Sequence, residues 1–134
     1  MQLTFSWTEQ HGTLSPHCES NVVNRDGMCL LASILMDDGG CGHAHSIDWL
    51  DEGLKRIDSV SSGESRALDW SRETWGATLT NKEVTIRSLH DESYSQRVGL
   101  KEFETALAAW KSFLQHTPSL ESSMQVAVHV PDAT

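Results

Sequence analysis

The residues that could carry metal chemistry lie in one short segment, which reads Cys41-Gly42-His43-Ala44-His45. Cysteine and histidine are common zinc ligands. A structural zinc site usually takes four ligands in two separated pairs, and the second pair is missing here. The same pattern is typical of a polar, glycine-rich loop. We therefore predict no metal or cofactor, and we keep a metal site at Cys41, His43 and His45 as an alternative hypothesis.

No local signature of nucleophilic or nucleotide-binding catalysis occurs in the sequence. Three cysteines and seven histidines allow Cys–His pairs, but none lies in a recognised nucleophile motif. The serine-hydrolase and glycine-rich phosphate-binding motifs are absent. Paired acids such as Asp51-Glu52 lie in polar stretches, whereas a general acid needs burial or a nearby like charge to raise its pKa. We therefore predict a protein that is not an enzyme and has no catalytic residue. A metal- or thiol-dependent enzyme that uses Cys41 is the alternative.

The composition is acidic, with nineteen Asp and Glu against ten Lys and Arg in 134 residues and a net charge of −9. Binding to nucleic acid phosphates requires basic side chains, so this charge argues against a nucleic-acid partner. It also argues against an anionic membrane surface. A basic protein partner suits such a chain, because opposite charges steer association. Simple solubility is the alternative explanation.

The excess negative charge is concentrated between Arg25 and Lys55. No Lys or Arg lies between these two residues, but six acids do. The helix dipole favours acids at the start of a helix, which explains Asp48 to Glu52 but neither Asp37 nor Asp38. We therefore predict a binding surface for a basic protein partner. Its residues are Asp37, Asp38, Asp48, Trp49, Asp51 and Glu52.

Two of the five tryptophans, Trp49 and Trp70, fall outside the apolar faces of the predicted elements. Trp7, Trp75 and Trp110 lie on such faces, so core packing explains them. An exposed tryptophan is a typical anchor of a protein–protein interface. We therefore predict that Trp49 and Trp70 are exposed.

Alternation of apolar and polar residues, which is typical of half-buried strands, predicts the strands of the fold. The first strand covers residues 3–7, and a return strand follows at residues 14–18. The alternation over residues 74–89 predicts a hairpin, whose four-residue loop places Leu79 opposite Val84.

Apolar residues at spacings of three and four predict helices over residues 46–60 and 100–115. The short apolar run at residues 28–36 is compatible with a strand or a helix, and we favour a helix. The polar segment at residues 90–98 is predicted as an exposed loop. Residues 119–134 are predicted as a C-terminal extension, either an extra strand or a flexible tail.

Together these elements predict an α+β fold in one domain over residues 1–118. An antiparallel sheet of four to five strands packs against two to three helices, and the C-terminal amphipathic helix closes the core. The first seven residues lack the basic and apolar regions of a signal peptide, and the longest apolar run is too short to cross a bilayer. We therefore expect a cytoplasmic protein with free cysteines.

A family resemblance concerns the second half of the chain. It rests on residues 75–79 (WGATL), 83–86 (EVTI), 98–103 (VGLKEF) and 106–114. These residues resemble the C-terminal half of small proteobacterial proteins of the YacL-like type. They are also similar to immunity proteins of contact-dependent growth inhibition systems, which share a hairpin, an acidic loop and a closing helix. The resemblance covers roughly forty residues at mainly core positions, which specify fold better than function.

This resemblance implies an immunity or antitoxin-like protein. Such a protein neutralises a cognate toxin domain, in many cases a nuclease, by stoichiometric binding in the cytoplasm. The acidic block fits this role, because carboxylates can replace nucleic acid phosphates on a basic toxin surface. The alternative is a small cytosolic housekeeping protein of the YacL-like type without a toxin partner.

Overall fold

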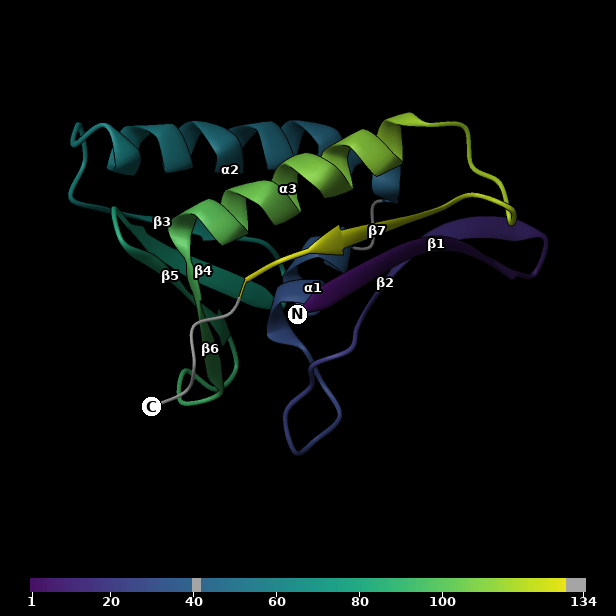
Figure 1. The fold of residues 1–134 in the computed structure, drawn as a ribbon, viewed down its shortest axis with the longest axis horizontal. Helices are drawn as coiled ribbons and strands as arrows, with labels where there is room; N and C mark the ends of the chain where they lie inside the picture. Colours follow the sequence, from purple (N-terminus) through teal and green to yellow (C-terminus); the bar gives the residue numbers. More distant parts are fainter. Residues whose placement is uncertain (40–41, 130–134) are drawn as a thin grey trace.

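The computed structural model of the protein describes residues 1–39 and 42–129, which form two antiparallel sheets and three α-helices (Figure 1). The first sheet contains β1 (Gln2–Gln10), β2 (Thr13–Ser20) and β7 (Ser123–Ala127), with β1 in the centre. The predicted α+β class, with antiparallel strands packed against helices, is confirmed.

The second sheet consists of four consecutive strands. They are β3 (Ala67–Ser71), β4 (Trp75–Thr80), β5 (Glu83–Ser88) and β6 (Ser95–Gly99), in that spatial order. The predicted hairpin is the β4–β5 pair, in the predicted register. The described residues therefore contain seven strands in two sheets, where the sequence predicts one sheet of four to five strands.

Two of these strands, β3 and β6, are absent from the sequence prediction. The predicted exposed loop at residues 90–98 is wrong in its second half, because β6 pairs with β5 and places Val98 opposite Val84. Val98 is the one buried residue of β6, so this strand carries almost no apolar pattern. A strand recognised mainly by its backbone pairing leaves little signal in the sequence.

The helices are α1 (Leu30–Met36), α2 (Ser46–Ser61) and α3 (Leu100–Gln115), and a short 3₁₀ helix, η1 (His43–His45), leads into α2. Figure 1 shows α2 and α3 side by side along one side of the molecule, and the two helices contact each other. α1 contacts strands of both sheets and so connects them. Within the described residues, no helix combines the length and apolarity needed to cross a bilayer.

Aromatic side chains join the first sheet to α3. β1 buries Leu3, Phe5 and Trp7 on one face, as its alternation predicts. Phe5 meets Trp110 edge-to-face, with ring centroids 4.9 Å apart, and Trp7 stacks on Phe113 at 5.4 Å. Such pairs contribute beyond the apolar area that they bury. The amphipathic helix α3 therefore closes the core over β1, as predicted.

The C-terminal segment adds a strand to the first sheet. Of the two alternatives for residues 119–134, the extra strand is present as β7, which pairs with β1. The residue directly after it, Val128, is 2% exposed and donates a backbone hydrogen bond to the Met1 carbonyl. This strand thus belongs to the core of the fold. Residues 130–134 lie outside the described part of the chain.

The prediction that Trp49 and Trp70 are exposed is wrong. Their exposed fractions are 6% and 1%, and their rings stack with centroids 4.1 Å apart. Trp70 lies on β3 opposite the buried Ala77 of β4, so its side chain faces the core. Its indole nitrogen donates a hydrogen bond to the Trp49 carbonyl at 3.1 Å. The stack therefore attaches α2 to the second sheet.

The approach of α2 to Trp70 depends on a glycine. A Cβ atom at Gly53 would lie 2.8 Å from Cε2 of Trp70 and 2.9 Å from Cδ2 of Leu107. Both neighbouring side chains are buried in the core. Gly53 therefore provides the space in which the indole packs against the helix backbone.

We predict that Gly53→Ala destabilises the protein, even though alanine favours the helix by up to about 1 kcal/mol. Overpacking of a core costs typically about 1–3 kcal/mol, which outweighs that gain. Urea denaturation should show a lower midpoint. Lys55→Ala, at an exposed position of the same helix, should change the free energy of unfolding by less than about 0.5 kcal/mol. Equal midpoints for Gly53→Ala and the natural protein would contradict this packing role.

Candidate functional site

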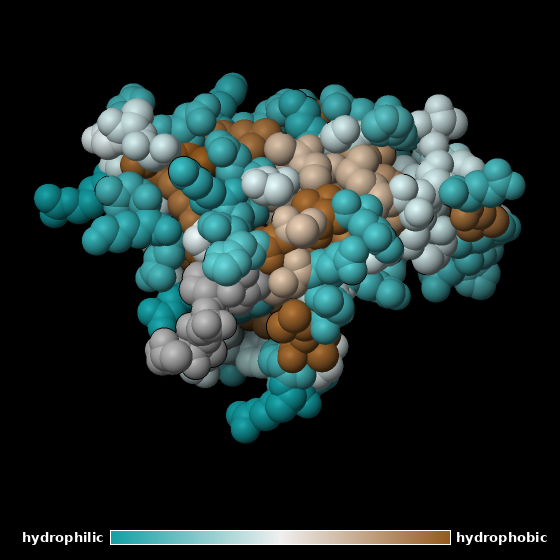
Figure 2. All heavy atoms as spheres, in the orientation of Figure 1, coloured by the Kyte–Doolittle hydropathy of each residue, from teal (hydrophilic) through white to brown (hydrophobic). Residues whose placement is uncertain are grey.

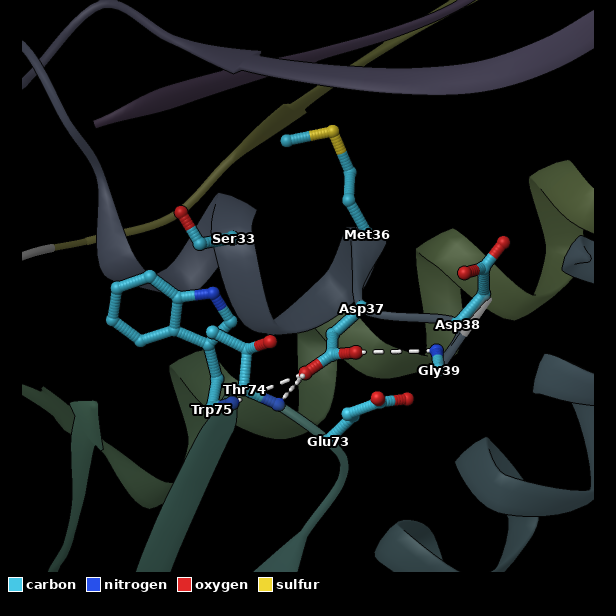
Figure 3. Close-up of a pocket in the computed structure, with 8 residues that line it drawn as sticks. All are labelled: Ser33, Met36, Asp37, Asp38, Gly39, Glu73, Thr74 and Trp75. Atoms are coloured by element: carbon cyan, nitrogen blue, oxygen red, sulfur yellow. Dashed lines mark hydrogen bonds between the residues drawn. The ribbon is translucent and has the colours of Figure 1, made fainter. Parts of the chain in front are cut away.

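Three adjoining hollows form one surface groove beside the end of α1 and the start of α2. The first hollow has a volume of about 450 Å³ and includes Asp37, Asp38, Glu73 and Trp75 in its walls (Figure 3). The second shares Glu73 with the first and has a volume of about 360 Å³. The third, of about 310 Å³, shares Arg72 with the second. We call these three hollows together the acidic groove.

The charge of the acidic groove is strongly unbalanced. Arg72 is the one Lys or Arg among its described lining residues. With His45 neutral, five carboxylates and one guanidinium leave a formal charge of −4. A hollow lined by one sign of charge concentrates the electrostatic field and attracts ligands of the opposite sign. The carboxylates belong to Asp37, Asp38, Asp48, Glu52 and Glu73.

Asp37 holds two parts of the groove together. Its Oδ2 atom accepts hydrogen bonds from the backbone N–H groups of Thr74 at 2.9 Å and Trp75 at 3.1 Å, and its Oδ1 atom accepts one from Gly39 (Figure 3). Hydrogen bonds from N–H groups to a carboxylate are stronger than neutral ones. Asp37 therefore ties the end of α1 to the start of β4, and its role in the fold is structural.

Arg72 is held against the inner side of the groove. One of its terminal nitrogens donates to the Asp38 carbonyl at 3.3 Å, and its guanidinium lies 5.3 Å from the ring centroid of Trp49. Its Nε atom is buried and has no hydrogen-bond acceptor among the described residues. The cation–π contact with Trp49 holds the guanidinium in place. The guanidinium of Arg72 is thus engaged by the Trp49 ring and the Asp38 carbonyl.

The acidic groove collects most of the residues that the sequence predicts for partner binding. Asp38, Asp48 and Glu52 line it, Asp37 supports it, and Trp49 forms part of its wall although its indole is buried. Glu52 also forms an exposed ion pair with Arg56 one helical turn later, at 3.4 Å.

Asp51 does not contribute to the groove. It forms an ion pair with Lys111 of α3 instead. The difference follows from helix geometry, because neighbouring positions on a helix point about 100° apart. Asp48 and Glu52 are four residues apart and share one face of α2, whereas Asp51 faces α3.

Glu73 is a groove residue that sequence reasoning misses. It is exposed in the connection between β3 and β4 and lines the first and second hollows. Its neighbour in the sequence is Arg72, so the local charge pattern is mixed and gives no signal. The pairing of β3 with β4 forms this turn, and the hydrogen bonds from Thr74 and Trp75 to Asp37 hold it beside the end of α1.

The alternative metal site gains no support from the described residues. His43 packs edge-to-face against Trp7 at 5.0 Å, and His45 is exposed at the start of α2. Cys41 lies outside the described residues. Within residues 1–39 and 42–129, no group of three or more His, Cys, Asp or Glu side chains is arranged to hold a metal ion.

Comparisons with known proteins found no match to any family model, curated protein or solved structure. The resemblance to immunity and YacL-like proteins therefore stays a prediction.

We predict that Asp37→Ala destabilises the protein by about 1–3 kcal/mol, because it leaves the N–H groups of Thr74 and Trp75 without their acceptor. Glu73→Ala removes the same charge from the same groove but no recorded hydrogen bond, and should change stability by less than about 0.5 kcal/mol. Thermal and urea denaturation of both variants would measure the difference. A loss of stability no larger for Asp37→Ala than for Glu73→Ala would exclude the bridging role.

Proposed function

We propose that this chain is an immunity-type protein that binds a cognate toxin domain stoichiometrically in the cytoplasm and neutralises it through the acidic groove. The observation that carries the proposal is the groove itself, with five carboxylates and one guanidinium along three adjoining hollows. Such a surface favours a basic protein partner and speeds its association. The proposed role is non-enzymatic and needs no cofactor.

A nuclease is the toxin class that fits this surface best. The surface with which a nuclease holds nucleic acid is basic, because it must neutralise phosphates. Asp48 and Glu73 come from different elements, are both exposed and line adjoining parts of the groove. In the proposed complex their carboxylates take the place of phosphates in the toxin's substrate site.

The decisive experiment uses the toxin domain encoded by the neighbouring gene. Co-expression of this chain should restore growth of cells that produce that domain, and titration calorimetry should give a 1:1 complex. Absence of a toxic product beside this gene, or failure to protect against it, overturns the proposal. In that case a housekeeping protein of the YacL-like type becomes the better hypothesis.

We predict that the double charge reversal Asp48→Lys and Glu73→Lys lowers the association rate with the toxin domain by about tenfold or more at low salt. It should also flatten the salt dependence of that rate, because fewer opposite charges are screened. Surface plasmon resonance at several salt concentrations measures both effects.

A matched control separates the groove from net charge. Glu104→Lys with Glu121→Lys changes net charge equally at exposed positions that do not line the groove. This control should lower the association rate by a smaller factor. If both double variants slow association equally, the groove is not the contact surface, even if the chain does neutralise the toxin.

A further inference from the structure

A fourth hollow, outside the acidic groove, also borders α1. It has a volume of about 380 Å³ and lies between β2, the loop over residues 21–28 and α1. Four of its lining residues carry sulfur, and we call it the sulfur-lined hollow. Its apolar part is formed by Cys18, Val23, Met28, Cys29, Ala32 and Met36, and the rest of its lining is polar, including His17, Glu19, Ser20 and Ser33.

The sulfur atoms of this hollow are polarizable. Cys18 and Cys29 are free and buried, and burial raises the pKa of the Cys18 thiol to about 12, so that it stays protonated at neutral pH. Met36 accepts a hydrogen bond from the backbone N–H of Cys18 at 3.3 Å, and Met28 accepts one from the Tyr94 hydroxyl at 3.5 Å. Methionine-rich surfaces adapt to apolar side chains of different shape.

The rim of the sulfur-lined hollow carries exposed apolar surface. Val23, which lines the hollow, is 51% exposed, and its neighbour in the sequence, Val22, is 46% exposed; they are two of four exposed large hydrophobic residues in the described chain. In Figure 2, hydrophobic atoms lie at the base of the loop between β2 and α1, above hydrophilic atoms at the tip of that loop. Adjacent exposed apolar side chains at the mouth of a hollow are typical of an interaction site.

The sulfur-lined hollow lies next to the acidic groove, and the two share lining residues of α1. Ser33 and Met36 line both it and the first hollow of the groove, so the exposed face of α1 forms a ridge between the two. An apolar site therefore lies next to a surface of formal charge −4. A partner segment laid across α1 would contact both the sulfur-lined hollow and the acidic groove.

We infer that the partner docks across α1 with a segment that carries both basic and apolar side chains, its apolar side chain entering the sulfur-lined hollow and its basic side chains meeting the acidic groove. The inference rests on the proposed function and specifies the chemistry of the partner. The charge of the groove selects a basic protein segment over an acidic one, over a second copy of this chain of net charge −9, and over an anionic lipid surface. The apolar contact supplies the slow dissociation that exposed charges alone do not give.

The test uses three short synthetic peptides as probes for the full chain: one of alternating Lys and Leu, one of Lys and Ser, and one of Glu and Leu. Fluorescence anisotropy should give the tightest binding for the Lys–Leu peptide. The Lys–Ser peptide should bind about tenfold more weakly, because it has no apolar side chain to bury. The Glu–Leu peptide should show no binding.

Two matched variants locate the contact. Val23→Ser should lower the affinity for the Lys–Leu peptide by about tenfold and leave the affinity for the Lys–Ser peptide unchanged. Leu120→Ser, at an equally exposed position that does not line the hollow, should leave both affinities unchanged. The double variant Asp48→Lys and Glu73→Lys should lower the affinity for both basic peptides. Thermal denaturation checks that each variant is folded.

Several outcomes would overturn the inference. These are equal affinity of the Lys–Leu and Lys–Ser peptides, binding of the Glu–Leu peptide, and equal effects of Val23→Ser and Leu120→Ser. A dimer that Val23→Ser dissociates, seen by light scattering, would make the hollow a self-interface instead. Each outcome differs from failure of the proposed function, which is a failure to neutralise the toxin domain. If neutralisation holds and Val23→Ser leaves toxin dissociation unchanged, only the apolar contact is wrong.

Discussion

The stack of Trp49 on Trp70 is the contact on which the arrangement of the acidic groove depends. It joins α2 to β3 through two buried rings and a hydrogen bond from one indole to the helix backbone. Gly53 makes the close approach of the ring possible. Because β3 leads directly into Arg72 and Glu73, the stack also determines where these two side chains meet the start of α2. The core contact and the surface charge pattern are therefore parts of one structural unit.

Asp37 provides the second attachment. The stack positions the turn after β3 relative to α2, and the Asp37 carboxylate positions the start of β4 relative to α1. With the turn held at both ends, Arg72 can extend over Trp49 and donate to the Asp38 carbonyl. The groove is thus built by groups that are themselves partly or fully buried, whereas its exposed carboxylates contribute little to the fold.

The helices and the central strands were predictable because their apolar residues repeat at the period of the element. α2, α3, β1 and the β4–β5 hairpin follow from this pattern, and the acidic block follows from a simple count of charges. The strands β3, which pairs with β4, and β6, which pairs with β5, were not predictable, since single buried residues such as Val98 make no period. Because β3 was not predicted, the burial of Trp49 and the position of Glu73 in the groove were not predicted either. The errors at Trp49 and Glu73 have one origin, because the contact between α2 and β3 joins segments separated in the sequence.

The acids between Arg25 and Lys55 divide into two physical groups once their partners are known. The Asp37 carboxylate accepts backbone hydrogen bonds, and Asp51 is paired with Lys111. The Asp48 carboxylate is exposed and directs its field toward solvent, as does that of Glu73, which lies outside this acidic block. A count of charges in the sequence cannot distinguish acids that stabilise the fold from acids that attract a partner, because both contribute equally to the net charge. The proposed recognition surface therefore differs from the acidic block: it excludes Asp51, includes Glu73 and is shaped by α1 and the β3–β4 turn. A partner must match that shape as well as the sign of the charge, and in the proposed complex this requirement gives an acidic protein its specificity.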